Sequence, residues 1–138
     1  MKRVVTLLLS IILVFGVMVP AAFAAEEGNA VQPRYLRIRS FDIAFDISSS
    51  GKSSCYSKIV TYESTDTIDL TIELQRDGGS GWSTIKTWTG EDTGRISLDK
   101  VWYVTSGYEY RLRITAEVYD TNGKLLETQI DYSKSVDY

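Results

Sequence analysis

The feature that most constrains the fold is a two-residue alternation of apolar and polar side chains. It is strongest at six alternating positions, Tyr108, Tyr110, Leu112, Ile114, Ala116 and Val118. A period of two places successive side chains on opposite faces of an extended chain, so this segment predicts a β-strand with one buried face. The same period predicts strands with one buried face at residues 41–47 and 68–74.

Further strands are predicted at residues 53–62, 82–88, 95–98 and 125–132, and an extension of 95–98 through residue 103 stays open. The 53–62 segment alternates, yet its inward face is not decided by the pattern. Residues 48–51, 77–81 and 89–94 are predicted turns, and no long helical period occurs. About seven short antiparallel strands predict an all-β, immunoglobulin-like β-sandwich, with a small β-barrel as the alternative.

The last hairpin allows two pairings. A two-residue Asn122-Gly123 turn sets Val118 against Glu127, Ala116 against Gln129 and Ile114 against Asp131. A three-residue loop over residues 121–123 sets Val118 against Leu126 and Ile114 against Ile130, and gives Gly123 the positive φ of a type I turn plus bulge. We expect the second pairing, because the first turns polar groups toward the core.

The N-terminal segment has a different character from the strands. Lys2 and Arg3 precede an apolar run over residues 4–19, and small residues follow up to Ala25. This order is typical of a secretory signal peptide (residues 1–25) cut after Ala24 or Ala25. An uncleaved membrane anchor and a buried helix are the alternatives, but the apolar run is short for a span of roughly 20 residues. We therefore expect a secreted protein, extracellular or associated with the cell envelope, with no membrane contact after cleavage.

Cleavage would leave a flexible leader at residues 26–34 and a β-sandwich domain at residues 35–138. Lys2 and Arg3 are two of the 15 basic residues and all 18 acidic residues lie after the cleavage site, so the remaining chain has a net charge of −5. An acidic surface without basic runs argues against nucleic acid as a partner.

Residue types that are absent exclude several chemistries. The chain has no histidine and a single cysteine, Cys55. Catalysis of the Ser-His type, most zinc sites and an internal disulfide are therefore excluded. The pair Asp42 and Asp46 could suggest glycoside hydrolysis, but polar outward faces of strands look the same and the domain is small for a deep cleft. We expect no enzyme activity, no cofactor, no metal site and no catalytic residues.

Residues 106–114, Ser-Gly-Tyr-Glu-Tyr-Arg-Leu-Arg-Ile, resemble the sixth strand of fibronectin type III and immunoglobulin-like domains. By this resemblance Tyr110 is the tyrosine-corner residue, whose hydroxyl bonds back to the preceding loop, and Leu112 takes the place of the second cysteine. The chain departs from antibody domains in having no partner for Cys55 and no proline-flanked tryptophan in the second strand.

Over residues 40–132 the chain resembles a family of small, uncharacterised secreted proteins of Gram-positive bacteria. The similar segments are residues 47–51, 72–76, 82–88 and 106–108. This resemblance implies an immunoglobulin/fibronectin type III-like β-sandwich and brings no activity or catalytic residues with it.

Aromatic side chains are the main candidates for ligand binding, namely Trp82, Trp88, Trp102 and Tyr103. An exposed aromatic plane can stack on the apolar face of a sugar ring, although aromatics in small β domains commonly serve packing. If Ile72 lies opposite Ile85, Trp82 and Trp88 share the outer face; if Leu74 lies opposite Trp82, both rings turn inward. Of Trp102 and Tyr103, one is expected to point outward.

Two further groups of residues offer candidate sites. Acidic residues at 66–69, 91–92 and 120–123 could offer oxygen ligands to calcium, but none matches a complete calcium-binding loop. Cys55 is either a small buried core residue or an exposed thiol that links two chains. Burial is expected, because it is the commoner outcome for a free cysteine, and no nearby basic cluster indicates a lowered pKa of the thiol.

These observations predict a secreted, non-catalytic binding module that acts at or outside the cell envelope. Its predicted partner is a polysaccharide or cell-surface glycan held by exposed aromatics. The alternative is a structural or protein–protein interaction module without a small ligand, which works by strand-edge addition or assembly.

Overall fold

The computed structural model describes residues 35–138, which form two antiparallel β-sheets that do not close into a barrel. The predicted β-sandwich is therefore confirmed, and the barrel alternative is wrong. The predicted signal peptide and the leader at residues 26–34 lie outside the described residues. No helix in the described part of the chain is long and apolar enough to cross a membrane.

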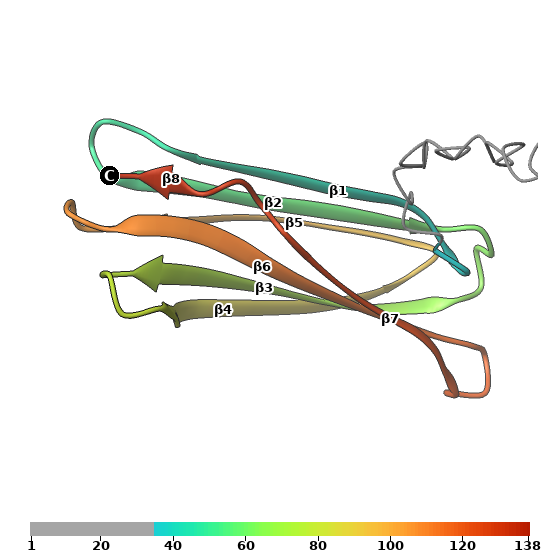
Figure 1. The fold of residues 1–138 in the computed structure, drawn as a ribbon. Coiled ribbons are helices and arrows are strands. Elements are labelled where there is room, and N and C mark those ends of the chain that lie inside the picture. Colours follow the sequence, from blue (N-terminus) through green and yellow to red (C-terminus); the bar gives the residue numbers. More distant parts are fainter. Residues whose placement is uncertain (1–34) are drawn as a thin grey trace, which may run out of the picture. The chain divides into compact units, whose positions relative to one another are not determined.

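The sandwich consists of a three-stranded sheet and a larger sheet (Figure 1). The smaller sheet has the order β1-β2-β5, formed by Ile38–Ile47, Lys52–Thr61 and Arg95–Tyr103. The larger sheet has the order β4-β3-β6-β7, formed by Trp82–Thr93, Thr67–Asp77, Glu109–Tyr119 and Leu125–Tyr132. A short strand that was not predicted, β8 (Val136–Asp137), pairs with the beginning of β6. In constant-type immunoglobulin domains the fourth strand joins the first two, whereas here β4 stays beside β3.

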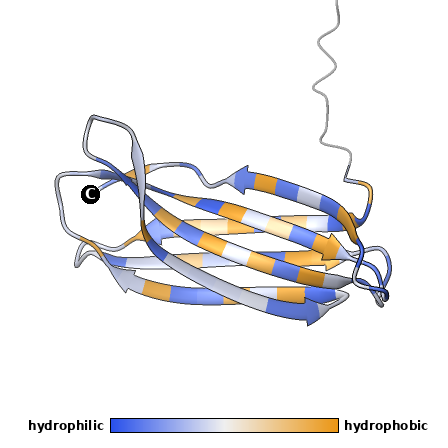
Figure 2. Cartoon of the chain, turned by 90° about the horizontal axis from the view of Figure 1, so that it is seen from below, coloured by the Kyte–Doolittle hydropathy of each residue, from blue (hydrophilic) through white to orange (hydrophobic). Residues whose placement is uncertain are grey.

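The core is built mainly by the larger sheet. Alternate residues along the strands are apolar, as Figure 2 shows by the change of colour along each strand. The inward-facing residues of β3 and β6 are fully buried: Ile68, Leu70, Ile72, Leu74, Leu112, Ile114, Ala116 and Val118. Burial of each large aliphatic side chain contributes roughly 1.5–3 kcal/mol, so these two strands supply most of the hydrophobic stabilisation.

Strand β2 presents its small residues to this core. Ser53, Cys55, Ser57 and Ile59 are completely buried, which decides the face that the sequence left open and confirms that Cys55 is a core residue. Both serine hydroxyls have acceptors on neighbouring strands, since Ser53 Oγ donates to the Trp102 carbonyl at 2.5 Å and Ser57 Oγ to the Asp42 carbonyl at 3.0 Å. Small side chains at the centre of β2 leave room for the bulky residues of the opposite sheet.

The prediction of a turn at residues 89–94 is wrong for most of that range. Strand β4 continues to Thr93, and the chain changes sheets at Gly94 alone. Gly94 has a φ of +73°, and a Cβ there would lie 2.8 Å from the carbonyl oxygen of Ser64. Its N–H donates to the Asp66 carbonyl at 2.8 Å and its carbonyl accepts from Thr61 N–H at 3.0 Å. A glycine held in this way lets β4 and β5 follow each other almost without a loop.

The hairpin between β6 and β7 has the predicted loop length but not the predicted residue pairs. Asp120 N–H donates to the Lys124 carbonyl and Gly123 has a φ of +79°, so the three-residue loop is confirmed. A bulge at Leu126 then shifts the ladder, so that Val118 faces Glu127 and Ile114 faces Asp131. The predicted pairs of Val118 with Leu126 and Ile114 with Ile130 are therefore wrong.

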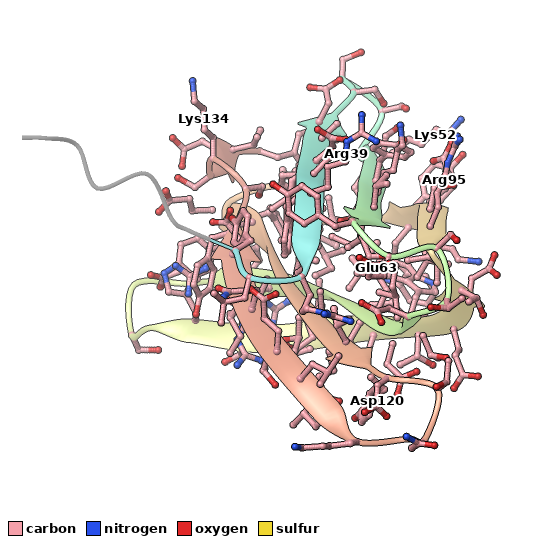
Figure 3. All side chains as sticks on the ribbon, turned by 90° about the vertical axis from the view of Figure 1, so that its right-hand side faces the viewer. Arg39, Lys52, Glu63, Arg95, Asp120 and Lys134 are labelled. Atoms are coloured by element: carbon pink, nitrogen blue, oxygen red, sulfur yellow. The ribbon has the colours of Figure 1, made fainter. Side chains whose placement is uncertain are left out.

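The C-terminal residues close one end of the sandwich. Tyr110 Oη donates to the Thr105 carbonyl at 2.6 Å, which confirms the predicted tyrosine corner. The backbone of Tyr138 pairs with Tyr108, and its hydroxyl donates to the Ser49 carbonyl at 3.2 Å, so this residue connects the two sheets. Away from the core, Lys134 and Lys52 point outward from the domain (Figure 3).

Candidate functional site

Trp82 lies on the outer face of the larger sheet. It stands directly opposite Asp77, and residues opposite each other on antiparallel strands point to the same face. A bulge at Ile85 separates this end of β4 from the other end, where Trp88 faces the buried Ile72. Neither predicted register occurs, and the two tryptophans point to opposite faces because the bulge changes the alternation between them.

Arg111 holds the Trp82 ring in place. Its guanidinium carbon lies 4.2 Å from the centre of the Trp82 ring and 4.3 Å from the centre of the Tyr132 ring. The Nε atom donates to Gln75 Oε1 at 2.9 Å, which fixes the guanidinium group between the two rings. Cation–π contacts of this kind contribute about 0.5–1 kcal/mol each at exposed sites. We call Trp82, Arg111 and Tyr132 the aromatic platform.

Polar side chains continue from the platform along the same face. Thr84 Oγ1 donates to Glu73 Oε1 at 3.1 Å and accepts from Gln75 Nε2 at 3.3 Å. Glu73 also pairs with Arg113, and this hydrogen bond raises the pKa of the Arg113 guanidinium, which therefore stays charged. The outer face thus combines two aromatic rings with hydroxyl and carboxylate oxygens that can accept from ligand hydroxyls, while the Gln75 amide is buried and bonded within the domain.

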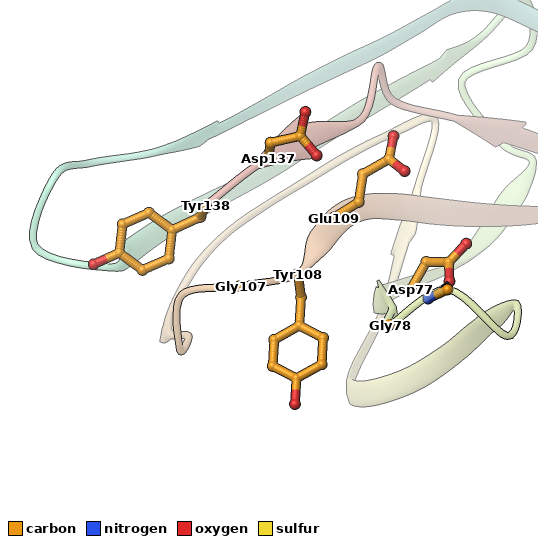
Figure 4. Close-up of a pocket in the computed structure, with 8 residues that line it drawn as sticks. Asp77, Gly78, Gly107, Tyr108, Glu109, Asp137 and Tyr138 are labelled. Atoms are coloured by element: carbon orange, nitrogen blue, oxygen red, sulfur yellow. Dashed lines mark hydrogen bonds between the residues drawn. The ribbon is translucent and has the colours of Figure 1, made fainter.

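A hollow of about 550 Å³ lies beside the platform at the end of the larger sheet. Asp77, Glu109 and Asp137 line it and stand directly opposite one another on β3, β6 and β8. Figure 4 shows the Glu109 and Asp137 carboxylates on one side of the strands and the Tyr108 ring on the other. Within residues 35–138, no group of three or more acidic or cysteine residues has a geometry that could hold a metal ion. The hollow adds carboxylate acceptors next to Trp82.

The other two predicted tryptophans, Trp88 on β4 and Trp102 on β5, lie on the side of the sandwich where these two edge strands approach each other. Lys86 Nζ is 5.9 Å from the centre of the Trp88 ring and 4.6 Å from that of Trp102. Trp88 is half-buried against the core, whereas the side chain of Trp102 is 41% exposed to solvent. Packing therefore explains Trp88.

Tyr103 is the most exposed of the predicted site residues, at 67%. It lies opposite Lys52 on the outer face of the smaller sheet, so of this pair it is Tyr103 that points away from the core. The four predicted residues thus occupy three separate places, and the structure does not bring them together. Sequence reasoning missed Arg111 and Tyr132, although alternation along residues 109–113 already places Arg111 on an outward face.

The remaining candidate residues have local roles. Asp66 Oδ1 accepts from Arg37 Nη2 at 2.8 Å, and Asp120 Oδ1 accepts from the backbone N–H groups of Asn122 and Lys124. Asp42 and Asp46 are exposed on the outer face of β1 and line none of the hollows described above. Burial raises the pKa of the Cys55 thiol to about 11, so Cys55 is protonated at neutral pH.

No protein-family model and no curated protein matches this chain.

Proposed function

We propose that this protein is a secreted, non-catalytic binding module that acts at or outside the cell envelope and recognises polysaccharide or cell-wall glycan. The observation that carries the proposal is the aromatic platform, in which Arg111 holds Trp82 and Tyr132 on the outer face of the larger sheet. Secretion is supported by the pattern of residues 1–25.

The chemistry of the platform suits a sugar ring. The C–H groups on one side of a pyranose are weakly positive and apolar, and they match the negative face of an aromatic ring. Thr84 and Asp77 lie beside the rings and keep oxygen lone pairs that can accept from the sugar hydroxyls. The carboxylates of Asp77, Glu109 and Asp137 would repel a polyanion, so we favour a neutral or amino-bearing glycan.

Two observations support a role without catalysis. The chain has no histidine, and Asp42 and Asp46 lie on an exposed strand face where no deep cleft encloses a substrate. The hollow at Asp77 is wide open to solvent, as expected for a surface that holds a polymer rather than one that excludes water from a reaction.

Depletion of the protein by insoluble polysaccharide tests the proposal. The purified protein, whose N-terminus is defined by intact mass, is mixed with cellulose, chitin or peptidoglycan, and the protein left in solution is measured. We expect depletion by at least one polymer, and roughly tenfold weaker binding for Trp82→Ala/Tyr132→Ala, since each ring contributes about 0.5–1.5 kcal/mol.

The matched control is Tyr103→Ala, which removes an exposed ring from the other sheet. This variant should bind like the parent protein, and circular dichroism confirms that all variants are folded. Absence of depletion by every polymer, or equal loss in Tyr103→Ala, contradicts the proposal.

A further inference from the structure

Apart from the two-residue strand β8, the sandwich formed by residues 35–138 has four edge strands, and three of them carry inward-pointing polar or charged side chains. Lys86 on β4 lies opposite the buried Leu74, and Lys100 on β5 lies opposite the buried Cys55. On β7, Glu127 and Asp131 take inward positions opposite Val118 and Ile114. Inward-pointing charges at an edge oppose the addition of another strand, so these three edges are protected.

Strand β1 is the exception. Its inward-facing residues Phe41, Ile43, Phe45 and Ile47 are all apolar and only half-buried. Its ladder with β2 is regular from Ser40 to Ile47, without a bulge that would turn the edge away. Three of these residues line a groove of about 470 Å³ whose other wall is residues 131–134. The edge of β1 therefore has an apolar wall and lacks the protection seen on the other edges.

The backbone of β1 also offers hydrogen-bonding groups at this edge. Ser48 N–H donates to the Lys52 carbonyl, and the Asp42 carbonyl accepts from Ser57 on β2. The even-numbered residues of β1 thus direct their backbone groups toward β2. Because successive residues of a strand alternate in this direction, the N–H and C=O groups of Phe41, Ile43 and Phe45 face the free edge.

The aspartate charges on β1 limit the register in which a second β1 strand could pair with it. Near the middle of the regular ladder of residues 40–47, antiparallel pairing of β1 with a copy of itself can be centred on Asp42, Ile43 or Ala44. The first register places Asp42 opposite Asp42 of the other copy, and the third places Asp42 opposite Asp46. Centring on Ile43 places Asp42 opposite Ala44 and Ser40 opposite Asp46, so no two like charges are directly opposite. It also places Phe41 opposite Phe45 on the groove side.

We propose that β1 pairs with β1 of a second copy of this chain, antiparallel and centred on Ile43. The two smaller sheets then form one continuous sheet, and the aromatic rings of each copy cover part of the other's groove. The contact is isologous, so it closes as a two-fold dimer and does not extend into a filament. The pairing residues lie on β1 of the smaller sheet, whereas Trp82 and Arg111 of the aromatic platform lie on the larger sheet; Tyr132 belongs to both the platform and the groove wall.

Substitution of Ala44 tests both the dimer and its register. Ala44 is exposed on the outer face of β1, so a charge there does not disturb the core. In the proposed register Ala44→Lys faces Asp42 of the other copy twice per dimer, whereas Ala44→Asp creates two like-charge pairs. Sedimentation equilibrium over a range of concentrations measures the dissociation constant, again on protein of defined intact mass.

We expect Ala44→Lys to tighten the dimer and Ala44→Asp to weaken it, each by a factor of about 2 to 30. The control variants Ser97→Lys and Ser97→Asp place the same charges on the outer face of β5, at the other edge of the same sheet, and should change nothing. A strictly monomeric protein at all soluble concentrations overturns the proposal. So does a dimer that responds to the Ser97 variants but not to the Ala44 pair, or a β1 edge that is occupied by a different protein.

Discussion

Glu127 accepts the backbone N–H group of Arg37 at 2.6 Å, across 90 residues of sequence. The same carboxylate accepts the N–H groups of Leu36 at 3.1 Å and Ile38 at 3.2 Å. These contacts explain why a polar residue can occupy an inward position on β7. The bulge at Leu126 turns Glu127 toward the start of β1, where three donors need an acceptor.

Replacement of Glu127 by alanine should destabilise the domain by about 2–3 kcal/mol, because three N–H groups at this largely buried position lose their acceptor. Urea unfolding measures the loss, and amide hydrogen exchange should become faster at residues 36–38. The exposed Glu63, labelled in Figure 3, provides the control: Glu63→Ala should change the free energy of unfolding by less than about 0.5 kcal/mol. Equal effects of the two variants would show that the Glu127 contacts do not stabilise the fold.

Tyr110→Phe should cost about 1–2 kcal/mol of unfolding free energy. The substitution keeps the buried ring and removes only the hydroxyl that donates to the Thr105 carbonyl. Tyr103→Phe removes a hydroxyl from an exposed ring and should leave thermal and urea unfolding unchanged. An unaltered midpoint for Tyr110→Phe would argue against a stabilising tyrosine corner.

The stability contributed by Cys55 should fall as the pH rises from 9 to 11. Burial raises the pKa of this thiol from 9.0 to about 11 in the folded protein, so over that range the unfolded chain loses a proton that the folded chain keeps. Ionisation of the unfolded state therefore favours unfolding, by about 1–2 kcal/mol near the upper end of the range.

The comparison that isolates this effect is the difference in unfolding free energy between the parent protein and Cys55→Ala at pH 8 and at pH 10.5. Tyrosines and lysines titrate in both proteins, so their contributions cancel in the difference. A difference that is the same at both pH values contradicts the prediction.

Asp69→Asn should stabilise the domain by about 0.5 kcal/mol at neutral pH and low salt. Asp69 lies directly opposite Glu91 on β4 and Glu117 on β6, and like charges at such positions repel. Its Oδ1 atom is also buried without a hydrogen-bond partner in the described part of the chain. The gain should shrink as salt is added.

Asp46→Asn, on an exposed position opposite Ser54, is the matched control and should have no comparable effect. Thermal unfolding at two salt concentrations measures both variants. A loss of stability in Asp69→Asn would show that the carboxylate stabilises the fold and would contradict the prediction.

Much of the fold could be predicted because alternation is a local property. The period of two at residues 108–118 and 68–74 requires only that one side of a strand is apolar, and both strands form with those residues buried. The inward face of β2 could not be predicted in this way. Serine and cysteine lie on one side of the strand and tyrosine and valine on the other, so the two sides do not differ clearly in hydrophobicity. Its inward face was decided by the space that the large side chains of the opposite sheet leave.

The candidate site could be predicted only in part. Trp82 was identified from its residue type, but its partners Arg111 and Tyr132 come from strands that follow it by many residues and become neighbours only through the pairing of β3, β6 and β7. The even spacing of Trp82 and Trp88 along the chain predicts that both rings lie on one face of the strand. The bulge at Ile85 removes that relationship.

The sequence by itself determined an all-β antiparallel fold and the positions of most of its strands, and the resemblance of residues 106–114 implied the tyrosine corner at Tyr110. The tertiary structure decided for the sandwich and against the barrel. Only the tertiary structure decided the register of β4 on β3 and of β7 on β6. Each register depends on one bulged residue, Ile85 or Leu126, and a bulge shifts every later pair by one position. The bulge at Leu126 places Glu127 against the β1 backbone, a contact distant in sequence that leaves no trace in local periodicity.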